Sequence, residues 1–268
     1  MPADQIAENL AFINWTILSG VAAGAFGAVV VLRLRSQATT GYLGFTALTA
    51  AAFGALAWLS DGVLPASDWG SPRRLALALF TILAVAMAFA VGRGGRGVLV
   101  GAAGSIAATA ALAFGALDWG GTPVGALLLL IQLVVLAAAT GGVWAAMILG
   151  HWYLVTPKLP EAPLVLFSRL LLWVVGLQLV LSLVWLAAGA GPAAAGGFAD
   201  LTGPWAMFVW LRLLVGLLLP LVVSWAAIQT ARSRSMESAT GLLYVNVGAI
   251  ASGTILAAGL YFGAGLLV

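Results

Sequence analysis

The stretch VGALLLLIQLVVLAAATGGVWAAMILG occupies residues 124–150 and contains no charged side chain. A helix rises about 1.5 Å per residue, so a helix of this length is long enough to cross the roughly 30 Å hydrocarbon core of a bilayer. A strand of a membrane barrel would alternate apolar and polar residues, whereas this run is continuously apolar. The stretch therefore predicts a transmembrane helix.

Seven further stretches have the same character. Lipid offers no hydrogen bonds to an open strand edge, so each of them is also expected to be helical. The eight predicted spans cover residues 10–32, 41–59, 75–92, 97–117, 124–150, 164–188, 204–230 and 239–266. We therefore predict an all-α, polytopic bundle of transmembrane helices that forms a single integral membrane domain over residues 1–268.

The composition agrees with a lipid environment. Only 7% of the residues are charged and 63% are hydrophobic, whereas soluble domains carry about 25% charged residues. The formal net charge of +3 is spread over short connectors, so we expect no nucleic-acid partner. The chain has no cysteine, which excludes disulfides and thiolate catalysis. Its connectors are too short to hold an active site, so we do not expect it to be an enzyme on its own.

The charged residues fall into two sets, according to the side of the membrane on which their connectors lie. The connectors after spans one, three, five and seven carry Arg33, Arg35, Arg93, Arg96, Lys158, Arg232 and Arg234. The opposite side carries Asp4, Glu8, Asp61, Asp68, Asp118 and Asp200, with Arg73 and Arg74 as its only basic residues. The positive-inside rule then places the first set in the cytoplasm and both termini outside. Together with an Ala/Gly/Leu-rich, Lys-poor composition, this predicts a multi-pass protein of a bacterial inner membrane.

Two pairs of short segments resemble each other. FGALAW at residues 53–58 matches FGALDW at 114–119, and RLRS at 33–36 matches RSRS at 232–235. One interpretation is chance similarity in a chain of low complexity. The other is a tandem unit of four helical hairpins, all in one orientation. The inverted repeats of many transporters change orientation between halves, so this pattern weighs slightly against an alternating-access carrier.

Familiar catalytic motifs are missing or misplaced. GRGGRG at residues 92–97 formally matches the dinucleotide fingerprint, but no strand precedes it, so we interpret it as a basic turn. Apart from Asp118, no carboxylate falls within a predicted span. Because proton and sodium carriers usually bury carboxylates along their path, a cation-coupled mechanism is disfavoured.

Polar residues near the predicted cytoplasmic side form one candidate cofactor site. Its members are His151, Tyr153, Arg169, Tyr244 and Asn246. His151 is the only histidine, and three interpretations stay open: a residue of the interfacial aromatic belt, a hydrogen-bond partner of a quinone headgroup, or a haem ligand. Haem ranks below quinone, because a chain with one histidine would need a methionine as the second axial ligand. No metal site is predicted.

A second candidate site, for a substrate, lies toward the opposite side, with one member, Gln178, near mid-depth in span six. Its members are Asn14, Gln132, Gln178 and Arg212. Arg212 falls well inside span seven, where an arginine costs about 2.5–3.5 kcal/mol at the helix centre on insertion scales. It either extends to the lipid phosphates, or pairs with an anion, a quinone or a propionate, or is buried against another subunit. Pro220 is expected to kink the same span and to free a carbonyl.

Three functions follow from these features. The first is a membrane-embedded subunit of a larger respiratory or electron-transfer complex, with a quinone or lipid headgroup bound near the cytoplasmic interface. The second is a permease for a small anionic or neutral solute, with Arg212 and Gln178 on its path. The third is a structural membrane scaffold. Lipid is the expected partner in each case, and other membrane or peripheral subunits are expected in the first.

Overall fold

The computed structural model describes residues 1–35, 38–156, 158–192 and 197–268. Over these residues eight helices are long and apolar enough to cross a membrane, as expected of a multi-pass membrane protein. Seven crossings are continuous: α2 (Leu10–Arg35), α3 (Thr40–Asp61), α4 (Gly70–Ala90), α5 (Gly94–Trp119), α6 (Pro123–Val155), α7 (Ala162–Ala188) and α10 (Met236–Ala264). The remaining crossing consists of α8 (Ala206–Leu213), the π-helix η2 (Leu214–Leu218) and α9 (Leu219–Arg232). Outside the crossings lie α1 (Pro2–Glu8) and the 3-10 helix η1 (Gly197–Leu201).

Local sequence determines where several helices begin and end. Thr39 and Thr122 cap α3 and α6, because each side chain accepts a hydrogen bond from a backbone N–H in the first turn. Helices α6 and α7 also have proline in their first turn, where its missing N–H costs nothing. Gly189 caps the end of α7, and its φ of 60° is a left-handed conformation that glycine adopts without steric cost.

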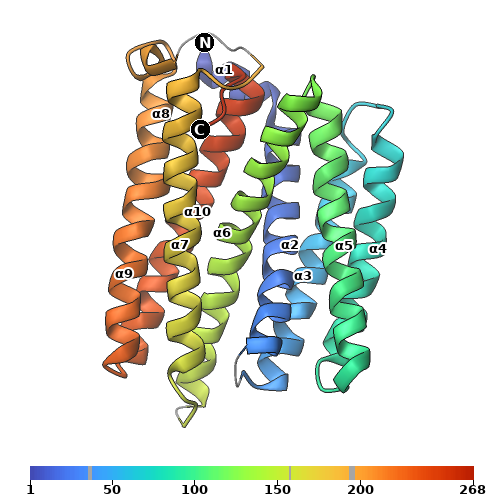
Figure 1. Ribbon diagram of the computed structural model, residues 1–268, viewed down its shortest axis with the longest axis vertical. Coiled ribbons are helices and arrows are strands. Elements are labelled where there is room, and N and C mark those ends of the chain that lie inside the picture. The colour runs from blue at the N-terminus through green and yellow to red at the C-terminus, as the bar shows by residue number, and fades with distance from the viewer. Residues whose placement is uncertain (36–37, 157, 193–196) are drawn as a thin grey trace.

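The crossings pack as two adjoining four-helix groups (Figure 1). In the first group, α2, α3, α4 and α5 pack in succession, and α5 closes the group against α2. In the second group, α6 packs on α7, α7 on α9, and α9 on α10, which closes against α6. Helices α2 and α6 lie side by side at the junction and connect the two groups.

Glycines allow α2 and α6 to approach closely at this junction. A Cβ atom at Gly24 would overlap the carbonyl oxygen of Ala137, and one at Gly141 would overlap the backbone of Gly24 and Ala25. Backbone atoms cannot rotate out of the way, so both positions require glycine. Close backbone approach of this kind is a main source of affinity between helices in lipid, where burial from water contributes nothing.

The structure confirms the all-helical fold and the eight predicted spans in the described part of the chain. The largest differences are at α4, which begins at Gly70 rather than 75, and at α6, which ends at Val155 rather than 150. The two termini lie at the same end of the bundle (Figure 1). The compartment they face, the tandem hairpin repeat and the single-domain organisation stay predictions.

Candidate functional site

A buried arginine lies inside the second group. Arg212 is 1% exposed and lies about 9 Å along α8 from its first residue. Its Nη2 donates a hydrogen bond to Oε1 of Gln178 at 3.0 Å, and its Nη1 donates to the carbonyl oxygen of Gly216 at 3.4 Å. Within the described residues, no carboxylate forms an ion pair with it. The guanidinium is therefore held by neutral acceptors alone.

The backbone around Arg212 is shaped by one proline and two glycines. In an α-helix the Gly216 carbonyl would accept from the N–H of residue 220, but Pro220 has none. This carbonyl is thus available to Arg212, and the chain is π-helical at this level, a conformation common at functional sites. A Cβ at Gly253 of α10 would lie 2.9 Å from Nη1 of Arg212 and 2.6 Å from the Gly216 Cα. Only glycine at position 253 leaves room for the guanidinium.

A small cavity of about 10 Å³ adjoins the guanidinium. Arg212, Gln132, Gln178 and Ser182 supply its polar lining, and Trp185 is among its apolar residues. Arg212 Nε, Gln132 Oε1 and Ser182 Oγ are buried and have no hydrogen-bond partner among the described residues. Both glutamines are anchored through their amide nitrogens, which donate to backbone oxygens of Val268 and Val135. The lining is otherwise apolar, and three unpaired polar atoms belong to residues that line this cavity.

Unpaired polar atoms are concentrated in the second group. Of the six buried side-chain atoms without a partner in the described part of the chain, five belong to its helices and the sixth is Trp15 Nε1. Besides the three at the cavity, they are Oδ1 of Asn246 and Oγ of Ser168. Asn246 donates through Nδ2 to Ser224 Oγ at 2.8 Å and lies about 15 Å along α10 from its start. The second group therefore carries polar positions at two depths.

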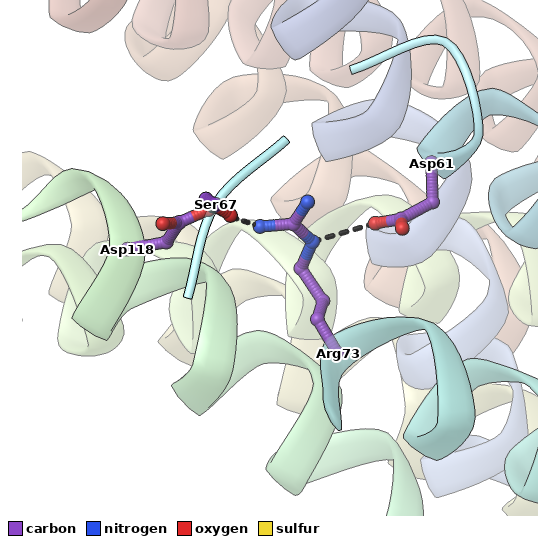
Figure 2. Close-up of polar contacts among 4 residues, drawn as sticks. All are labelled: Asp61, Ser67, Arg73 and Asp118. Atoms are coloured by element: carbon purple, nitrogen blue, oxygen red, sulfur yellow. Dashed lines mark hydrogen bonds and ion pairs between the residues drawn. The ribbon is translucent and has the colours of Figure 1, made fainter. Parts of the chain in front are cut away.

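The first group also buries an arginine, but this one is neutralised (Figure 2). Arg73 donates through Nε to Asp61 Oδ1 and through Nη1 to Asp118 Oδ2, both at 2.5 Å. Ser67 donates its hydroxyl to the same Asp118 oxygen at 2.7 Å. The guanidinium also lies 4.8 Å from the ring centroid of Trp119, a favourable cation–π distance. With two carboxylates around one cation, Arg73 needs no added anion.

This ion-pair network corrects the sequence-based position of two arginines. The sequence predicts Arg73 and Arg74 in the connector before the span at 75–92, whereas they lie within the first five residues of α4. Arg73 points inward, and Arg74 lies 4.4 Å from the ring centroid of Trp58. The available signal was that Asp61 and Asp118 fall at the same end of two neighbouring spans as Arg73. Without knowing which helix faces meet, the sequence could not pair them.

The structure brings together three of the four residues predicted for the substrate site. Arg212, Gln178 and Gln132 all line the small cavity. Asn14 does not take part, because its exposed side chain donates to Ser60 Oγ at 3.0 Å, at the contact of α2 with α3.

The five residues predicted for the cofactor site do not form a hydrogen-bonded cluster. These residues are His151, Tyr153, Arg169, Tyr244 and Asn246. Tyr153 is buried and donates its hydroxyl to the Pro160 carbonyl at 2.5 Å, and Asn246 is buried against Ser224. The other three side chains are exposed. Over the described ranges, no hydrogen bond or ion pair joins any two of the five, and a cofactor role for them stays a prediction.

Comparisons with known protein families, with curated proteins and with solved structures find no match for this chain. Its function is therefore inferred from its own residues. The contrast between Arg73 and Arg212 provides the main chemical clue.

Proposed function

We propose that this protein is a permease for a small monovalent anion, which binds at Arg212 within the second group. The observation that carries the proposal is the buried guanidinium of Arg212. Among the described residues it has no carboxylate partner, and its Nε is unpaired in a residue that lines a small cavity. Removing an ion from water costs several kcal/mol even after the protein relaxes. An anion in the cavity would offset this cost through a direct ion pair with Arg212.

The chemistry of the cavity limits the ligand. Nε of Arg212 and the hydroxyl of Ser182 can both donate to an anion, and a half-turn of the Gln132 amide would add an N–H donor. A water molecule could also bridge these atoms, but it would leave the positive charge uncompensated. A volume of about 10 Å³ is close to that of one water-sized probe. The cavity therefore favours a compact monovalent ion over a carboxylate or phosphate.

The second polar position supports a route across the membrane. Asn246 and Ser224 lie farther than the Arg212 cavity from the end of the bundle that carries both termini. The Asn246 Oδ1 has no hydrogen-bond partner among the residues that the structure describes. A permeating ion needs sites that bind it without holding it too tightly, and apolar constrictions between such sites can act as gates. The π-helix at Leu214–Leu218 and the following Pro220 provide a local departure from α-helix that can bend. We propose that this segment adjusts when the ion leaves Arg212.

Anion flux into liposomes tests the proposal. The purified protein is reconstituted alone, and halide and nitrate fluxes are compared for wild type, Arg212→Gln and Arg74→Gln. Arg74→Gln is a charge-matched control, because Arg74 lies over Trp58 in the first group, away from the cavity. We expect flux in wild type and in the control, and its loss in Arg212→Gln. Absence of flux in wild type, or equal flux in Arg212→Gln, would contradict the proposal.

A second proposal keeps the membrane-subunit function, with the protein in a bacterial inner membrane and the arginine-bearing connectors in the cytoplasm. The observation that favours it is the exposure of His151, Arg169 and Tyr244, which leaves these side chains accessible to a quinone headgroup or a partner subunit. Extraction from native membranes in a mild detergent should then recover stoichiometric redox subunits or bound quinone. A protein that purifies alone and without quinone would argue against this second function.

A further inference from the structure

An apolar groove lies between the two groups, separate from the Arg212 cavity. It has a volume of about 360 Å³ and is open to the outside of the bundle. Small residues of α2 and α6 form its floor, among them Gly24, Gly27, Ala137 and Ala138. Helix α5 supplies one wall through Ala108 and its neighbours, and α7 supplies the other through residues 167–174. One wall therefore belongs to the first group and the other to the second.

The dimensions of the groove restrict what can occupy it. Its lining on α2 runs from residue 23 to residue 31, which corresponds to about 12 Å of helix. A partner helix that crosses the roughly 30 Å hydrocarbon core would extend well beyond the groove. Its apolar lining at the depth of the hydrocarbon core fits a flexible hydrocarbon chain.

A positively charged side chain near one end of the groove indicates that the bound lipid has an anionic headgroup. Val31 lines the groove, and Arg35 follows it one helical turn later on the same face of α2. Arg35 is exposed. In contrast, Arg33 is half-buried and already engaged by the protein, since it donates to the carbonyls of Val91 and Gly94 at 2.9 and 2.6 Å. Arg35 can therefore meet an anionic headgroup at the membrane surface while the attached chain enters the groove.

We propose that this groove binds one acyl chain of an anionic phospholipid, with the phosphate at Arg35. The lipid comes from the leaflet next to the arginine-bearing connectors, because Arg35 lies at that end of α2. Its chain contacts α5 of the first group and α7 of the second, so it fills the space that direct packing leaves open at their junction. The proposal does not depend on the transport function.

Native mass spectrometry in a mild detergent tests this site. Wild type is incubated with equal amounts of phosphatidylglycerol and phosphatidylcholine, and the retained lipid is identified. We expect one phosphatidylglycerol bound in preference to phosphatidylcholine. Gly27→Leu should abolish retention, because a Cβ at Gly27 meets nothing within 4 Å and the larger side chain occupies the groove. Arg35→Gln should keep the chain bound but lose the preference for the anionic lipid.

Gly248→Leu is the matched control. Gly248 lies on α10 away from the groove, and a Cβ there also meets nothing within 4 Å, so this variant should retain phosphatidylglycerol like wild type. Equal retention by Gly27→Leu and Gly248→Leu would overturn the site, as would an unchanged lipid preference in Arg35→Gln. Retention of an isoprenoid quinone instead of a phospholipid, after extraction from native membranes, would overturn the identity of the occupant.

Discussion

Replacing Gly253 with alanine should separate α10 from the helix that carries Arg212. The new Cβ would lie 2.6 Å from the Gly216 Cα, 2.9 Å from the Gly216 carbonyl oxygen and 2.9 Å from Arg212 Nη1. Two of these three atoms belong to the backbone, so a side-chain rotation cannot relieve the overlap. The helices must move apart, and the guanidinium must leave its place against α10.

The expected cost follows from two opposing effects. Forcing an extra methyl group into a packed interface typically costs about 1–3 kcal/mol, whereas alanine is better than glycine in a helix interior by about 1 kcal/mol. Gly248→Ala on the same helix isolates the second effect, because its Cβ meets nothing within 4 Å. The free energy of unfolding of Gly253→Ala should therefore be about 1–3 kcal/mol lower than that of Gly248→Ala.

Equilibrium unfolding in detergent micelles measures this difference, and anion flux into liposomes reports on the site itself. Gly253→Ala should lose stability relative to Gly248→Ala and should also reduce flux, since Arg212 is displaced. If the two variants are equally stable and transport equally well, then α10 and η2 do not approach each other as described. The geometry of the Arg212 site would then be wrong.

The remaining predictions concern the first group and the junction. Arg73→Gln leaves Asp61 and Asp118 without their buried cation, so it should lower the free energy of unfolding by about 3–5 kcal/mol. Arg74→Gln removes only a cation–π contact and should cost about 1 kcal/mol or less; equal losses in the two variants would contradict a buried network. Gly24→Ala should reduce thermal stability, because its Cβ overlaps backbone of α6, whereas Gly27→Ala one turn away should not. Thermal melts of that pair in detergent check this, and a Gly24→Ala variant as stable as Gly27→Ala would rule out the close helix contact.

The fold could be predicted from sequence because one physical requirement dominates it. A segment in hydrocarbon must satisfy its own backbone, so every long apolar run becomes a helix. The helix ends were less predictable. Arg73 lies in the first turn of α4, outside the predicted span, because a buried ion pair allows a charged residue to continue the helix. Likewise, α6 continues through His151 to Val155, since helical hydrogen bonding does not stop where the apolar run ends.

The candidate site could be predicted in part. Depth along each helix follows from residue spacing, which predicts that Arg212 and Gln132 lie toward the same side of the membrane and that Gln178 lies near mid-depth. The depth of a residue along its helix does not show which other helices lie beside it. Asn14 therefore joined the same prediction, although its helix α2 presents it to Ser60 of α3. The Arg73 network was missed for the same reason, because it depends on the packing of α3, α4 and α5 around one side chain.

The two buried arginines show why the second group is the better place to look for function. A protein that only needed stable packing could have surrounded both cations with carboxylates, as it does with Asp61 and Asp118 around Arg73. At Arg212 it instead supplies amide and carbonyl oxygens, which attract the guanidinium but leave its charge uncompensated. A carboxylate at this position would occupy the place of an incoming anion. The uncompensated charge is a cost that a mobile ligand can offset, and this requirement favours reversible anion binding over a purely structural role.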